Sequence, residues 1–147
     1  MNRFVFSLER IRAWNATRLQ IEETAVEAIV ERQRRAEMAF AEVCAQRTEF
    51  EQFTLRKRAI ESSELGRIEQ FRTFVVSEGK RTRGILADLA RQIAERRLRI
   101  VEIKRKIELF DRLRERQQDA WTAEETKELQ AAADEAFLQK LVAAKRG

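Results

Sequence analysis

The chain runs for 147 residues without a single proline and with only four glycines. Inside a helix, proline costs about 3 kcal/mol and glycine about 1 kcal/mol relative to alanine, so their scarcity leaves few points at which a helix must end. Alanine, leucine, isoleucine, glutamate, arginine and glutamine are abundant, and all of them favour helix or tolerate it well. The sequence therefore predicts an all-α protein with very long helices.

Charged residues of both signs are interspersed along the chain and make up 37% of it. Such a pattern is typical of helices that expose most of their surface to water instead of enclosing a thick core. The basic excess lies in residues 64–121, which carry fifteen basic and ten acidic groups. We interpret it first as a solvated, arginine-rich helix face, although it would also attract acidic partners.

In the first part of the chain, apolar residues recur at the heptad spacing of a coiled coil. The predicted seam has Val26, Gln33, Phe40 and Arg47 at positions a, and Ile29, Ala36, Val43 and Phe50 at positions d. The earlier apolar residues Leu8, Ile11 and Leu19 fit only if two four-residue steps follow each other near Asn15. This pattern predicts a stutter that locally unwinds the coiled coil.

The heptad pattern breaks at ESSELGR, residues 61–67. Ser62 and Ser63 are good helix caps, Glu64 suits the positive end of a new helix, and Gly66 loosens the backbone. We therefore expect a first helix over about residues 7–60, a turn over about 61–66, and a second helix over about 67–145.

The second helix carries a seam of its own, cleanest between Leu86 and Phe110. Its predicted d positions are Ile68, Val75, Thr82, Leu89, Arg96, Ile103, Phe110 and Gln117, and its a positions are Arg72, Gly79, Leu86, Ile93, Ile100, Ile107 and Arg114. Thr122 and Glu125 form a T-x-x-E capping box directly after Trp121, so a break near residues 121–122 is possible.

Two heptad segments joined by a short turn predict a single domain over residues 1–147, an antiparallel two-helix coiled coil or helical hairpin. The second helix would overhang the first and leave its C-terminal end partly unpaired. The predicted register places Phe50 near Glu78, Gln33 near Arg96 and Leu8 near Ala120. Polar seam residues fix such a register; they are Gln33, Arg47 and Arg96.

The sequence offers no catalytic or metal-binding constellation. There is no histidine, Cys44 is the only cysteine, and GKRTRG at residues 79–84 lacks the spacing of a phosphate-binding loop. Carboxylates are numerous, but they lie on exposed helix faces without a cleft to shift their pKa values. We expect neither an enzyme nor a cofactor. No stretch approaches the ~20 apolar residues that span a bilayer, so a cytosolic protein is the default.

Surface contacts remain as the source of function. Phe71 at a g position and Phe74 at a c position lie shortly after the predicted turn, where they form either a hydrophobic plug or a docking surface. Basic runs near residues 96–99 and 104–106 favour nucleic acid. Acidic residues are interleaved with them and no aromatic stacking platform accompanies them, so we expect no nucleic-acid partner.

Several segments in order resemble one family. The opening FVFSLERI, residues 4–11, resembles the N-terminal F-x-F-x-L-E signature of the FliJ family of flagellar type III export proteins. KRKIELFDRLRERQ at residues 104–117, ETKEL at 125–129 and DEA at 134–136 resemble the closing segments of that family. The resemblance covers nearly the whole chain.

The resemblance implies a cytoplasmic protein of bacterial flagellum biogenesis and motility, held at the cytoplasmic face of the inner membrane through its partners. The family folds as a two-helix antiparallel coiled coil similar to the central stalk of rotary ATP synthases. The implied partners are the hexameric export ATPase and its regulator, the export-gate membrane protein, and export chaperones.

The same resemblance implies two contact sites. For the ATPase ring, the chain ends would contribute Phe4, Val5, Phe6, Leu8 and Trp121. For the export gate, an ungapped match gives Phe71, Val75, Glu78 and Thr82, and a shift of three residues brings in Phe74.

Alternatives remain for each of these expectations. The apolar N-terminal residues would otherwise close the coiled-coil end by packing on the region of Trp121. The protein as a whole would otherwise be the equivalent stalk of a virulence type III secretion system, or a generic self-associating coiled-coil scaffold.

Overall fold

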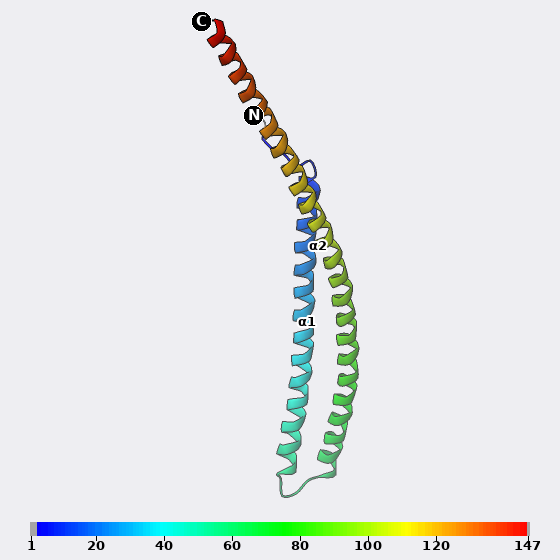
Figure 1. Ribbon diagram of the computed structural model, residues 1–147. Helices are drawn as coiled ribbons and strands as arrows, with labels where there is room; N and C mark the ends of the chain where they lie inside the picture. The colour runs from blue at the N-terminus through cyan, green and yellow to red at the C-terminus, as the bar shows by residue number, and fades with distance from the viewer. Residues whose placement is uncertain (1–2, 147) are drawn as a thin grey trace. The chain divides into compact units, whose positions relative to one another are not determined.

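The computed structural model describes residues 3–146, which form two long helices (Figure 1). Helix α1 spans Glu9–Leu55 and helix α2 spans Ser62–Arg146. The helices pack against each other as a hairpin, and no strand occurs in the described residues. The predicted fold class, an all-α antiparallel two-helix coiled coil, is confirmed.

The chain divides into two compact units. Residues 19–101 form the first, here called the hairpin unit, and residues 1–18 with 102–147 form the second, here called the terminal unit. Each is described by itself.

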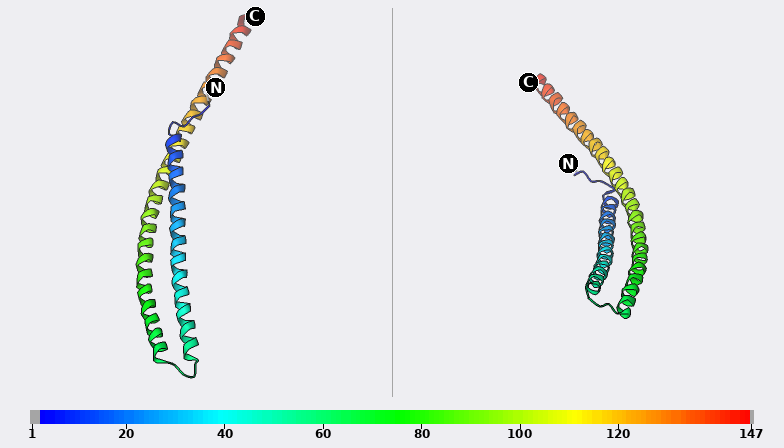
Figure 2. Two further views of the ribbon diagram at one scale, coloured as in Figure 1. Left: turned by 180° about the vertical axis from the view of Figure 1, so that it is seen from behind. Right: turned by 90° about the horizontal axis from the view of Figure 1, so that it is seen from below.

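In the hairpin unit, α1 and α2 run antiparallel along the predicted seam (Figure 2). Every predicted seam residue of α1 is buried or half-buried, and so are those of α2 in this unit apart from Arg72. The best-buried cluster joins Ile29 to Leu89 and Ile93, with Val26 packed against it. Burying large aliphatic side chains contributes roughly 1.5–3 kcal/mol each, so these layers are the main source of stability.

The predicted stutter near Asn15 is wrong. Positions Leu8, Arg12 and Asn15 are buried or half-buried on the same heptad that continues through the rest of α1, whereas Ile11 is 46% exposed. The stutter was needed only to keep Ile11 in the seam. Polar side chains occupy those seam positions instead, and the heptad runs without interruption.

The loop lies earlier than predicted. Helix α1 ends at Leu55, where the amide of Arg56 still donates to the Gln52 carbonyl at 3.2 Å, and α2 begins at Ser62. The Glu61 carbonyl accepts the first bonds of α2, and Lys57 pairs with Glu64 at 3.1 Å across the loop. The ESSELGR segment therefore opens the second helix instead of forming the turn.

This displacement of the loop shifts the hairpin register. Phe50 contacts Phe71, seven residues before the predicted Glu78, and Arg96 pairs with Glu22 at 3.0 Å instead of lying near Gln33. A first helix that ends earlier moves the crossing point of the two helices toward the N-terminus. Residues of α1 such as Phe50 and Glu22 consequently meet an earlier part of α2 than predicted.

In the terminal unit, α2 continues through Trp121 and Thr122 to Arg146, so the possible break near residues 121–122 is absent. The hydroxyl of Thr126 donates to the Thr122 carbonyl at 2.9 Å, a bond that leaves the helix intact. Residues 126–146 are all exposed, which confirms the predicted overhang of α2. The predicted seam positions Arg114 and Gln117 are also exposed, so the continuous run of buried and half-buried seam residues ends before them.

Candidate interaction surfaces

The N-terminal segment, residues 3–8, packs its two phenylalanines and leaves the valine between them free. Phe6 is 5% exposed, and the half-buried Phe4 ring lies 6.1 Å from the Trp121 ring at an angle of 53°. Val5 is 78% exposed. The segment therefore closes the seam with alternate residues, as an extended chain with period two allows.

Because of this packing, the residues predicted to contact the ATPase ring differ in how exposed they are to a partner. Val5 is free for a partner, Phe6 is not, and the half-buried remainder are Phe4, Leu8 and Trp121. The structure thus brings these predicted side chains together. Part of their apolar surface is buried by packing within the chain, so it is not exposed to a partner.

Polar contacts hold the start of α1 against α2 in the terminal unit. Arg12 Nε donates to Asp111 Oδ1 at 2.6 Å, and this hydrogen bond raises the pKa of Arg12 above its ordinary value. Asn15 is buried and donates to the Ile11 carbonyl at 3.0 Å, while its side-chain oxygen has no partner among residues 3–146. Such polar seam positions cost stability and specify register.

Trp14 is an exposed residue that the sequence reasoning missed. Its indole is 60% exposed and lies 4.7 Å below the guanidinium of Arg18, an exposed cation–π pair worth about 0.5–1 kcal/mol. The signal available beforehand was its c position in the uninterrupted heptad, which points away from a two-stranded seam.

The C-terminal part of α2 carries several unpaired apolar side chains. A shallow hollow of about 630 Å³ lies along this part of the helix, between Glu135 and Arg146. The exposed apolar residues are Leu129, Phe137, Leu138, Leu141 and Val142. The overhang predicted from the sequence places these residues beyond the paired part of the hairpin.

At the loop end of the hairpin unit, four phenylalanines gather. The Phe50 and Phe71 rings lie 6.0 Å apart, and Phe71 stacks on Phe74 at 6.1 Å. Phe74 is 47% exposed and Phe53 is still more exposed. A groove of about 440 Å³ is lined by Phe50, Phe71 and Phe74 together with Gln46, Arg67 and Gln70.

The two interpretations of this cluster, a hydrophobic plug and a docking surface, apply to different residues. Phe71 plugs the end of the seam against Phe50, whereas Phe74 lines an open groove. Val75 lies in the seam and is 5% exposed, so it offers no surface to a partner. Glu78 and Thr82 are half-buried beside Phe40 on the same side of the hairpin. The usable part of the predicted gate contact is therefore Phe74 with the edge of Phe71.

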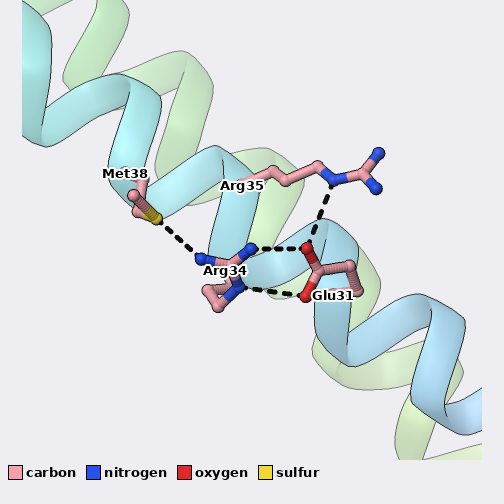
Figure 3. A network of polar contacts seen from close by, with 4 residues as sticks. All are labelled: Glu31, Arg34, Arg35 and Met38. Carbon is pink, nitrogen blue, oxygen red and sulfur yellow. Dashed lines mark hydrogen bonds and ion pairs between the residues drawn. The ribbon is translucent and has the colours of Figure 1, made fainter.

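A polar network on the outer face of α1 has a local role. Glu31 accepts two hydrogen bonds from Arg34 and one from Arg35, and Arg34 also reaches the sulfur of Met38 (Figure 3). The bonds from Arg34 lower the pKa of Glu31 to about 2. All four residues lie on one helix at spacings of three or four, so the network supports the helix itself.

The described residues contain no group of acidic, cysteine or histidine side chains placed to hold a metal ion. Within residues 3–146, neither helix has a stretch long and apolar enough to cross a membrane. Comparisons with protein-family models, curated proteins and solved structures gave no match.

Proposed function

We propose that this protein is a stalk and adaptor of the flagellar type III export apparatus, as the resemblance to the FliJ family implies. It acts through surface contacts, without chemistry of its own, at the cytoplasmic face of the inner membrane. Its N-terminal segment and the C-terminal part of α2 enter the export ATPase ring, and its loop end faces the export gate. Export chaperones and the ATPase regulator are further partners.

The observation that carries the proposal is the unpaired apolar surface of the terminal unit. Val5 and the apolar side chains of residues 126–146 have no covering element, although removing apolar surface from water is favourable by about 25 cal/mol per Å². Large uncovered apolar surface of this kind marks a binding partner. A helix end inserted into a ring of subunits would be covered on all sides, which suits a helix with apolar side chains on several faces.

The gate contact is proposed at the loop end, through Phe74 and the exposed edge of Phe71. The groove that they line combines three phenylalanines with the polar side chains of Gln46, Arg67 and Gln70. This arrangement is typical of a small docking site for an apolar side chain.

Site-specific photocrosslinking tests the ring contact. A photoreactive residue replaces Val5 or Leu138, and the control replaces Leu65 near the loop, which is also exposed. With the assembled export ATPase of the same organism, we expect covalent adducts from positions 5 and 138 and none from position 65. Circular dichroism checks that each variant remains helical. Adducts from none of the positions, or equally from all three, would overturn the proposed ring contact.

A further inference from the structure

The hairpin unit has two long sides that flank its seam, and the ion pairs and ring contacts across the seam identify them. On one side, residues at d and g meet: Glu22 at d pairs with Arg96 at d, and Phe50 at d packs on Phe71 at g. On the other, Glu51 at e pairs with Arg72 at a, at 2.7 Å. The first is called the d/g side and the second the a/e side. Antiparallel pairing places the e positions of both helices on the a/e side.

Along the a/e side, apolar and charged residues alternate from one heptad to the next. From α1 the e positions are Glu23, Val30, Glu37 and Cys44, and from α2 they are Val76, Arg83, Ala90 and Arg97. All are exposed except the half-buried Cys44. Apolar or small side chains therefore lie between the charged ones along this exposed side of the hairpin.

The two helices carry opposite charge on this side. On α2, the e, b and f positions between residues 80 and 101 hold four basic residues and no acidic one; they are Lys80, Arg83, Gly84, Ala87, Ala90, Arg91, Ala94, Arg97, Leu98 and Val101. On α1, the neighbouring e and b positions carry Glu23, Glu27 and Glu37, with Arg34 held by Glu31. An acidic ridge therefore lies beside a basic ridge.

Several of these charges have no partner in the chain. Lys80, Arg97, Glu27 and Glu37 are exposed and form no ion pair within residues 3–146. Between the charges of α2 lie small side chains, which allow another helix to approach closely. A surface made of one acidic and one basic ridge is complementary to itself.

We propose that the a/e side of the hairpin unit binds a second copy of this chain. A twofold axis parallel to the hairpin places the acidic ridge of each copy on the basic ridge of the other, which gives a four-helix arrangement. A twofold axis across the hairpin would set acid against acid. An anionic membrane or an acidic helix would meet the carboxylates of α1 on the same side, so a second copy is the occupant that satisfies both ridges.

The available area suits a weak, salt-sensitive dimer. About 25 residues of each helix span roughly 38 Å, and two helices side by side are about 20 Å wide. The resulting face, on the order of 700 Å² per copy, lies near the ~800 Å² of a standard interface. This inference goes beyond the proposed function and does not depend on it, because it concerns the isolated chain.

The proposed twofold contact can be tested directly through Cys44, the only cysteine of the chain. As an e residue it lies near the proposed axis, so the cysteines of the two copies face each other. Treatment of the purified full-length protein with a short bismaleimide should give a covalent dimer. The matched control combines Cys44→Ser with Ala39→Cys, which moves the thiol to an exposed g position on the d/g side. We expect at least tenfold less covalent dimer from the control.

Charge reversal tests complementarity. Lys80→Glu with Arg97→Glu gives one variant, and Glu27→Lys with Glu37→Lys gives another. Each variant alone should lose at least tenfold of the crosslinked fraction, because like charges then face each other in both halves of the interface. A mixture of the two variants should regain it as a heterodimer, since both halves are complementary again.

Light scattering over a range of concentrations and salt gives the second readout, and circular dichroism shows that each variant is folded. A wild-type protein that stays monomeric without crosslinking would overturn the proposal. So would crosslinking that charge reversal leaves unchanged, or that the relocated thiol reproduces.

Discussion

Gly79 shows how a single missing side chain sets the distance between the helices. It lies buried in the seam, and a Cβ atom at this position would stand 3.2 Å from Cζ of Phe40 and 3.5 Å from Cε2. The Phe40 ring borders a hollow of about 190 Å³, so it has room to move by a few tenths of an ångström. At Gly84, by contrast, an added Cβ would meet nothing within 4 Å.

Substitutions at the two glycines should therefore differ. Gly84→Ala should stabilise the protein by about 1 kcal/mol, the full gain in helix propensity, and Gly79→Ala by less because Phe40 must move. Gly79→Leu should destabilise it by roughly 1–3 kcal/mol through overpacking. Urea denaturation followed by circular dichroism measures all three free energies of unfolding. Equal stabilisation by both alanines would contradict the close approach of Phe40.

At the scale of the elements, the heptad pattern predicted both seams but misplaced the loop. Seam residues such as Ile29, Val75 and Leu89 follow from periodicity, because burial on one helix face repeats every seven residues. The loop has no comparable local signal: residues 56–58 are basic and helix-compatible, and basic charge is favourable just after a helix end. Gly66 predicts a turn by its residue type, yet it lies inside α2.

In the candidate sites, too, the heptad period predicted the exposure of helical residues but not the course of the non-helical segment. The heptad placed Phe74 outside the seam and Val75 inside it, so their different exposure followed from the sequence. The packing of Phe4 on Trp121 depends on where the non-helical segment before α1 runs, and no period describes that segment. It entered the prediction only as an alternative.

The ion pair between Glu51 and Arg72 joins the two helices near the loop and should make the hairpin sensitive to acid. The hydrogen bond from Arg72 lowers the pKa of Glu51 below its ordinary value near 4.5. Because the folded pKa is the lower one, the stabilisation is complete above about pH 4.5 and is lost as the pH falls through the folded pKa.

A pH series of melting temperatures checks this expectation. Glu51→Gln should lower the melting temperature at pH 7 and should reduce its decline between pH 5 and pH 3. Glu42→Gln is the matched control, because that exposed carboxylate belongs to the same helix and pairs with no basic residue among residues 3–146. Identical pH profiles for the wild type and Glu51→Gln would show that the pair does not tie the helices in solution.

At the scale of the whole molecule, different parts of one hairpin carry different proposed contacts. The terminal unit offers Val5 and the apolar residues of the C-terminal part of α2, and the loop end offers Phe74. The a/e side of the hairpin unit carries the proposed contact with a second copy. The central claim is that the chain ends engage an export ATPase.

The measurement that tests this claim most directly is ATP hydrolysis by the purified flagellar export ATPase of the same organism. It is followed without the protein, with the intact chain, and with a form lacking residues 1–8. We predict that the intact chain stimulates hydrolysis and that the truncated, still helical form does not, because it lacks the segment that carries Val5. No stimulation and no binding by the intact, folded chain would contradict the stalk function and favour a self-associating scaffold.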